Sequence, residues 1–242
     1  VIAKQTPEIT IIVPDNVKVG DTISIQASSA GYNLTVWING VKQTIPNGII
    51  SYNVGNAGIY TIVAKTTEND AYYAANKTVA FEVTKHDMPL TITVENKDNI
   101  KVGDNVVINV TLPGAGAGEK VAIEINGQTY DNVTNAQGIA TFTVPSVTYG
   151  DKTVTALYNG TNRYYDNATT TTFNVDKHDS FVHITPSNAD VGGEVTIHVE
   201  VPAGATGYVY LNINGTYYVS IISSGINYPD LVIRGLGTGT YY

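Results

Sequence analysis

Residues 120–133 read KVAIEINGQTYDNV, two stretches of alternating apolar and polar residues joined by Asn126-Gly127. Alternation with a period of two predicts strands that bury one face. Asn-Gly is a preferred pair for a tight hairpin turn, because both central residues need a positive φ. The same Ile-Asn-Gly tripeptide begins at Ile38, Ile125 and Ile213, at spacings of 87 and 88 residues. The chain is therefore a tandem repeat whose period is about the size of one small domain.

Other short motifs recur with a similar period and indicate where the repeats meet. Val-Gly-Asp begins at Val19 and Val102, and Lys-His-Asp begins at Lys85 and Lys177. We interpret Lys-His-Asp as a polar joint between domains that is too short for free rotation, and Lys4-Gln5-Thr6 as a third joint. The predicted organisation is the tail of a preceding domain at residues 1–4, then repeat 1 at 5–87, repeat 2 at 88–179 and repeat 3 at 180–242.

Repeat 2 shows the strand pattern most clearly. Its apolar alternation breaks into seven short segments that are rich in β-branched residues and separated by Gly, Asn, Pro and Asp. No window has the 3.6-residue period of an amphipathic helix. We predict an all-β fold of tandem immunoglobulin-like antiparallel β-sandwiches. The expected strands of repeat 2 are residues 89–95, 104–112, 120–125, 128–133, 139–144, 152–158 and 170–175.

Repeat 3 is shorter than repeat 2, with 63 residues against 92. Gly239-Thr240-Tyr241 aligns with Gly58-Ile59-Tyr60, where the sixth strand of repeat 1 should begin. An immunoglobulin-like sandwich without most of its last two strands would expose its core and its sheet edges. Two explanations stay open: the chain continues, which we favour, or another molecule donates the missing strand.

Composition limits the classes of partner. Charged residues make up 14% of the chain, and the net charge is −8. Nucleic acids and anionic membranes need Lys and Arg to offset phosphate, so neither is an expected partner. Cysteine is absent, which excludes disulfides and thiolate metal sites. No apolar run reaches the roughly 18 residues of a membrane span, so we expect no membrane insertion in this segment.

The assembled motifs resemble the Ig-like repeats of large adhesin-like surface proteins, especially those of methanogenic archaea. The matching features are the Val-Gly-Asp turn, the Ile-Asn-Gly hairpin, the strand at residues 150–158 and the Asn-Arg-Tyr-Tyr loop at 162–165. The resemblance covers nearly the whole chain, and repeat 1 departs from it at residues 60–66. It implies a cell-surface stalk or adhesin, with no enzymatic residues to transfer.

Neither catalysis nor metal binding has a motif in the sequence. Gly-x-Ser-x-Gly, His-Glu-x-x-His and the phosphate-binding glycine loop are all missing. We interpret His86, His178, His183 and His198 as structural. The acidic residues are spread singly through loops rather than clustered as calcium requires. We expect no enzyme and no cofactor, with calcium at the domain junctions as the weaker alternative, and we put forward no residue as a metal ligand.

Glycosylation is a stronger possibility if the chain is exported. Seven Asn-x-Ser/Thr sequons occur, and one of them, Asn109, falls in mid-strand. Asn76 and Asn167 are the preferred candidates, because they lie at matching positions after the paired tyrosines. The other predicted acceptors are Asn159, Asn132, Asn33 and Asn214.

Trp37 is the most suggestive candidate for ligand binding. Alignment of the three hairpins puts Trp37 in register with Glu124 and Asn212, so its ring should point away from the core. Tyr208 and Tyr210 should share the corresponding outer face of repeat 3. Aromatic rings flanked by Asn and Thr suit sugar binding, and cross-strand packing on the exposed face is the alternative.

The combined hypothesis is a non-enzymatic stalk or adhesin segment at the cell surface, acting as spacer and adhesion surface in an extracellular setting. Its expected partners are glycans or proteins of another cell, or copies of itself. Two alternatives stay open. One is a subunit of an extracellular filament or surface layer, with intermolecular strand pairing near residues 231–242. The other is a carbohydrate-binding module.

Overall fold

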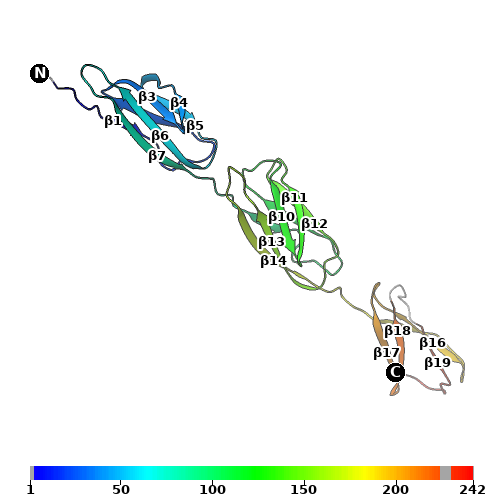
Figure 1. Ribbon diagram of the computed structural model, residues 1–242. Helices are drawn as coiled ribbons and strands as arrows, with labels where there is room; N and C mark the ends of the chain where they lie inside the picture. The colour runs from blue at the N-terminus through cyan, green and yellow to red at the C-terminus, as the bar shows by residue number, and fades with distance from the viewer. Residues whose placement is uncertain (1–2, 224–229, 242) are drawn as a thin grey trace. The chain divides into compact units, whose positions relative to one another are not determined.

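The computed structural model describes residues 3–223 and 230–241 and is built from antiparallel β-sheets (Figure 1). The described residues contain one short 3-10 turn, η1 (Pro46–Gly48), and no α-helix. The chain divides into two compact units, Val1–Asp176 and Lys177–Tyr242. The first unit holds two β-sandwiches, each with its own apolar core, and the second unit holds one. This is the predicted fold class, tandem immunoglobulin-like sandwiches.

The first sandwich packs a three-stranded sheet against a four-stranded sheet. Its strands alternate buried and exposed residues, as β2 shows most regularly. The three-stranded sheet has the order β1 (Ile9–Ile12), β2 (Thr22–Ser29) and β5 (Ile49–Asn53). The four-stranded sheet has the order β4 (Val41–Gln43), β3 (Tyr32–Ile38), β6 (Gly58–Thr67) and β7 (Ala75–Val83).

The second sandwich repeats this topology strand for strand. One sheet has the order β12 (Ile139–Val144), β9 (Val106–Thr111) and β8 (Thr91–Val94). The other has the order β11 (Gln128–Val133), β10 (Lys120–Ile125), β13 (Gly150–Tyr158) and β14 (Asn167–Val175). All seven strands fall where the sequence predicts them, with the bounds of β8, β9, β13 and β14 shifted by one to three residues.

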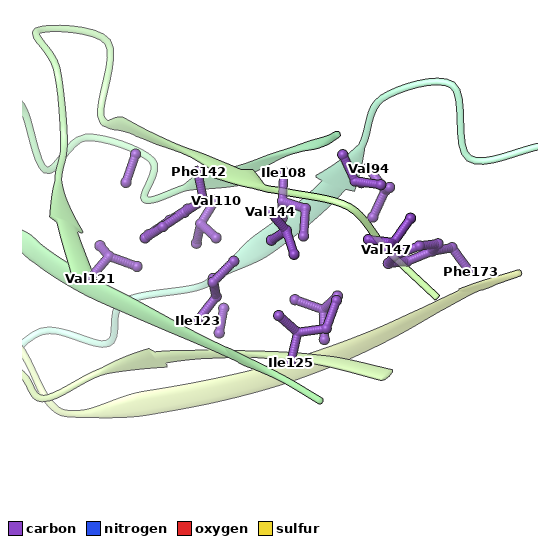
Figure 2. Packing of buried hydrophobic residues seen from close by; sticks show 14 of the residues in the cluster. Val94, Ile108, Val110, Val121, Ile123, Ile125, Phe142, Val144, Val147 and Phe173 are labelled. Carbon is purple, nitrogen blue, oxygen red and sulfur yellow. The ribbon is translucent and has the colours of Figure 1, made fainter. Parts of the chain in front are cut away.

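The core of the second sandwich is filled by β-branched and aromatic side chains that meet between the two sheets (Figure 2). Ile108 and Phe142 come from one sheet, and Ile123 and Ile125 come from the other. Ile108 and Ile123 are fully buried. Burial of such side chains is worth about 1.5–3 kcal/mol each. Each domain can therefore be stabilised without disulfides.

The hairpin turns have the predicted left-handed backbone. The φ angles of Asn39, Asn126 and Asn214 are 46°, 52° and 47°, and the glycine after each is also positive. The Asn-Gly prediction is confirmed in all three repeats. These turns fix the register of the hairpins β3–β4, β10–β11 and β17–β18.

The segment before the second strand of each complete sandwich pairs in parallel with the end of the last strand. In the first sandwich, Val19 N donates to Thr84 O at 3.0 Å, and Thr84 N donates to Val17 O at 3.0 Å. In the second, Val102 N donates to Asp176 O and Asp176 N donates to Ile100 O, both at 2.9 Å. In each complete sandwich, the segment between the first two strands is thus bonded directly to the end of the domain.

The second unit contains the five described strands of the third sandwich. β15 (His183–Pro186), β16 (Glu194–Glu200) and β19 (Asp230–Arg234) form one sheet. β17 (Gly207–Ile213) and β18 (Thr216–Ile222) form the other. Residues 230–234 pair with β16 as β12 pairs with β9 in the second sandwich. Tyr242, at the end of the edge that was predicted to pair between molecules, lies outside the described residues.

Because Trp37 is the only tryptophan of the chain, its fluorescence reports the unfolding of the first sandwich alone. We expect Ile123→Ala to destabilise the second sandwich by about 2–4 kcal/mol, through lost burial and the cavity left behind. Urea unfolding followed by circular dichroism should show an earlier transition, while the Trp37 transition moves much less. Ile38→Ala, at an equally buried position of the first sandwich, should move the Trp37 transition. A common shift of both signals by Ile123→Ala would contradict independent cores.

A buried tyrosine makes the stability of the second sandwich depend on pH in the alkaline range. Burial raises the pKa of the Tyr158 hydroxyl to about 12, with a further contribution from its hydrogen bond to Glu119 Oε2 at 2.8 Å. In the unfolded chain this pKa is about 10. The stabilisation is therefore present below pH 10 and is lost as the pH rises from about 10 to 12. The loss should amount to about 2–3 kcal/mol.

This pH dependence is measured as the urea midpoint of the second sandwich at pH 9 and at pH 11.5. Tyr158→Phe removes the ionisable group and should flatten the difference between the two values. If the urea midpoint fell equally between pH 9 and pH 11.5 in the parent chain and in Tyr158→Phe, the loss of stability would be assigned to other groups.

Candidate functional site: the joint between the first two repeats

The joint between the first two sandwiches, inside the first unit, is a bonded structure and not a free linker. His86 N donates to Arg163 O at 2.8 Å, and Tyr165 N donates to His86 O at 2.9 Å. This parallel bridge holds the joint against the loop between β13 and β14 of the second sandwich. On the other side, His86 Nε2 lies 3.0 Å from the carbonyl oxygen of Val19 in the first sandwich. His86 is therefore attached to both domains.

The loop to which His86 is hydrogen-bonded, residues 160–165, has a shape set by its own residues. Thr161 Oγ1 accepts hydrogen bonds from Arg163 N and Tyr164 N, both at 3.2 Å. Gly160 has a φ of +72°, and a Cβ there would lie 2.6 Å from Asp166 N. A glycine is therefore required at the start of the loop.

Side chains from this loop reach the first sandwich directly. Asn162 Nδ2 donates to Gly55 O at 3.0 Å and to Asn56 Oδ1 at 2.8 Å. In the reverse direction, Lys85 Nζ donates to Thr161 O at 2.6 Å. The two domains thus hold each other through hydrogen bonds that run both ways.

Arg163 and Tyr164 complete the contact. The Arg163 guanidinium lies 5.7 Å from the centre of the Tyr164 ring, and the Tyr164 ring is 5.9 Å from that of His86. A Cβ on Gly20 of the first sandwich would lie 3.8 Å from Arg163 Cζ. That is an ordinary van der Waals distance, so the guanidinium lies next to the Gly20 turn of the first sandwich.

The pair of backbone hydrogen bonds that ties His86 to its loop recurs at the start of repeat 1. Gln5 N donates to Ala71 O at 3.0 Å, and Tyr73 N donates to Gln5 O at 2.9 Å. Lys4 Nζ lies 2.6 Å from Glu68 Oε1. Gln5 thus takes the place of His86, and the Tyr72-Tyr73 loop takes the place of Tyr164-Tyr165. Gln5 therefore makes the backbone pairing that His86 makes, and a joint at Lys4-Gln5-Thr6 stays a prediction.

Trp37 lies on the outer face of β3, between Lys42 of β4 and Val63 of β6. Its side chain is partly buried. Lys65 Nζ lies 5.7 Å from the centre of the ring, a distance within the range of a cation–π contact. Part of the ring is therefore covered by residues of its own sheet.

Tyr208 and Tyr210 are more exposed than Trp37. They lie on one face of β17, with ring centres 6.2 Å apart and planes inclined by 41°. Across the hairpin they face Ile221 and Val219, and Tyr217 follows on the same face. All five side chains are more than half exposed. The structure therefore brings Tyr208 and Tyr210 together, whereas Trp37 belongs to the other unit.

The predicted glycosylation sites are all exposed, but their amide groups differ. Asn167 Nδ2 donates to Met88 O at 2.8 Å, and Asn132 Nδ2 donates to Thr141 O at 2.6 Å. A glycan is attached at this nitrogen and replaces one of its two hydrogens, so at these two sites the hydrogen bond would have to be made by the hydrogen that remains. Asn76 lies in β7, Asn159 follows β13, and Asn33 and Asn214 have left-handed φ angles.

Titratable groups do not gather into a reactive centre within residues 3–223 and 230–241. No group of three or more His, Asp or Glu side chains there could hold a metal ion. His198 Nδ1 lies 2.6 Å from Asp230 Oδ1, with both side chains about half exposed. In the same described residues, no helix is both long and apolar enough to cross a membrane.

The fold and the bonded joint place the chain among tandem immunoglobulin-like domain proteins. No protein-family model matches it, and no curated protein matches it. It is similar in structure to a 1.5-MDa bacterial ice-binding adhesin, with 19% identity over 96% of this chain and 88% of the other, and a TM-score of 0.37.

Two further solved structures have comparable scores. A Ca²⁺-stabilised adhesin of an Antarctic bacterium has 18% identity over 97% of this chain and 66% of the other, with a TM-score of 0.35. The I9–I11 tandem of titin has 12% identity over 95% of this chain and 90% of the other, with a TM-score of 0.33.

Proposed function

We propose that the chain is a non-enzymatic, surface-exposed segment of an extracellular stalk or adhesin, in which repeated immunoglobulin-like domains act as spacer and adhesion surface. The observation that carries the proposal is the joint at His86, bonded to the domains on both sides. A spacer must keep its length, and length is lost first by rotation at the joints.

The energetics of the joint favour a fixed geometry. Rotation there would break the bonds of Asn162 and Lys85 together with the His86 bridge. At about 1 kcal/mol for each exposed hydrogen bond, the set costs a few kcal/mol, several times thermal energy. A flexible linker would instead let the distance between domains vary as a random coil.

The partners and the source belong to the same proposal. The motif resemblance supports a surface protein of a methanogenic archaeon that carries glycans on some of its sequons. Candidate partners are glycans or proteins of another cell, or copies of the chain. A subunit of an extracellular filament is the alternative, and it would need the third repeat to accept a strand. Calcium is not required in this proposal, because the joint is bonded by side-chain and backbone groups.

The joint is tested by a distance measurement that uses the absence of native cysteine. Spin labels are attached to Thr78→Cys and Thr172→Cys, at exposed positions in β7 and β14. Double electron–electron resonance between them reports the separation of the first two domains. We expect a narrow distance distribution in the parent chain and an at least twofold broader one in Asn162→Ala/Lys85→Ala.

The matched control is Asn159→Ala/Lys97→Ala, which removes the same residue types elsewhere in repeat 2 and should leave the distribution narrow. The measurement is repeated with a chelator, which should change nothing. A broad distribution in the parent chain would refute the stalk proposal.

A carbohydrate-binding role is the second candidate, and the exposed aromatic face of β17–β18 favours it. Tyr208 and Tyr210 present neighbouring rings with hydroxyls that can bond to sugar. Stacking of a sugar on such rings needs no further pocket.

Affinity electrophoresis through polysaccharide gels tests this second role. If it holds, the parent chain is retarded by at least one polysaccharide, and Tyr210→Ala reduces the retardation at least fivefold. Phe181→Ala, an exposed aromatic residue outside β17 and β18, should not. Trp37→Ala asks whether the ring in the first sandwich contributes. Equal retardation of Tyr210→Ala and the parent chain would rule out sugar binding by the exposed aromatic face of β17–β18.

A further inference from the structure

The four-stranded sheet of the second sandwich is hollowed at one end. There β10, β11 and β13 surround a depression of about 460 Å³. Sites for small molecules have volumes of about 300–1,000 Å³ and combine apolar walls with a few polar groups. The depression has this size, and its lining also mixes apolar and polar residues.

The floor of the depression is apolar. Ala122 of β10 lies between its cross-strand partners, Leu157 of β13 and Asp131 of β11. The neighbours of Ala122 and Leu157 along their strands are buried, so these two side chains face outward. Val133, which pairs with Lys120, is 50% exposed. Apolar side chains thus stay open to solvent on a face that is otherwise polar.

Two of the lining residues, Asn132 and Asn159, begin sequons. Asn132 is held in place, because its Nδ2 donates to Thr141 O at 2.6 Å and its Oδ1 accepts from Val133 N at 2.8 Å. Asn159 is exposed, and within the described part of the chain its side chain has no hydrogen-bond partner. Asn159 is therefore the sequon of this depression whose amide is free to carry a sugar.

The first sandwich lacks both features at the corresponding place. Counted back from the Ile-Asn-Gly turns, Thr35 corresponds to Ala122, and it pairs with Lys65 where Ala122 pairs with Leu157. Two residues after Lys65 the sequence has no sequon, whereas two residues after Leu157 it has Asn159. The apolar floor and the sequon thus occur together in one repeat and are both absent from the other.

We propose that the depression is a saccharide-binding site, and that its natural occupant is the first sugar of a glycan linked to Asn159. The apolar C–H face of the sugar ring packs on Leu157 and Ala122. Lys120 offers a donor and Asp131 offers acceptors to the sugar hydroxyls. The covalent link keeps the sugar at a roughly millimolar effective concentration, so weak contacts suffice. The occupant rests on the proposed glycosylation, whereas the site itself does not.

Attachment of the glycan is a substitution at the anomeric carbon of the sugar. The bond from this carbon to the phosphate of a glycosyl-phosphate donor breaks, and a bond to Asn159 Nδ2 forms. The phosphate leaves with the bonding electron pair, and the nitrogen loses one hydrogen as a proton.

The test uses the absence of native cysteine to attach a sugar at a chosen place in the full chain. Asn159→Cys is converted to a mixed disulfide with a thio derivative of N-acetylglucosamine, and the methyl disulfide at the same position is the reference. We expect the sugar, but not the methyl group, to shift the methyl resonances of Leu157, Ala122 and Val133 and to give nuclear Overhauser effects to them. Because the sugar contacts only the folded domain, exchange of the most protected amides of the second sandwich should slow at least threefold.

Variants of the same sheet provide the matched controls. The sugar at Thr172→Cys, which faces outward at the opposite end of the sheet, should leave these resonances and exchange rates unchanged. Leu157→Lys gives the floor the residue that repeat 1 has there, and it should abolish the effects of the sugar at position 159. Thr153→Lys adds the same charge to the same strand outside the depression, and it should preserve them.

The inference is overturned by any of three results. The sugar and the methyl group at position 159 could give the same resonances and exchange rates. The sugar at position 172 could act like the sugar at position 159, or its effects at 159 could survive Leu157→Lys. Peptide masses of native material decide the occupant separately. A sugar-free Asn159 would refute the natural occupant and that part of the proposed function, and the result with the attached sugar would still decide the site.

Discussion

A β-strand that buries one face must present the other to solvent, and every domain of this chain depends on that alternation. In β10, Ile123 and Ile125 are buried while Glu124 between them is exposed. A slip of one residue would exchange the two sets. The Asn-Gly turns prevent the slip, because two consecutive residues with positive φ give the hairpin one length and one twist. Without cysteine, the register set by these turns also determines which apolar side chains hold the two sheets together.

The sequence predicts most of the fold because this alternation is local. β10, β11 and β12 have the predicted bounds, and the outward position of Trp37 follows from its register with Glu124. The last two strands are less accurate, since β13 begins two residues and β14 three residues before the predicted starts. There the apolar pattern fades, but cross-strand pairing continues.

The joint was harder to foresee. Asn162 and Asn56 are 106 residues apart, and neither lies in a patterned strand. Their contact depends on the loop made by Gly160 and Thr161 and on the turn near Gly20. The available signal was the recurrence of Tyr-Tyr and Lys-His-Asp with a common period. That signal predicted a boundary at His86, but not that His86 would be bonded to both domains.

In the two complete sandwiches, the parallel pairing of the segment after the first strand with the last segment has a mechanical consequence. Val17 and Val19 are bonded to Thr84, and Ile100 and Val102 are bonded to Asp176. When the two ends of such a domain are pulled apart, the paired segments slide past each other along their length. The hydrogen bonds across them then carry the load together in shear, instead of opening one after another as in a zipper. The pairing that closes each of the two complete sandwiches is thus also the part that resists tension along the chain.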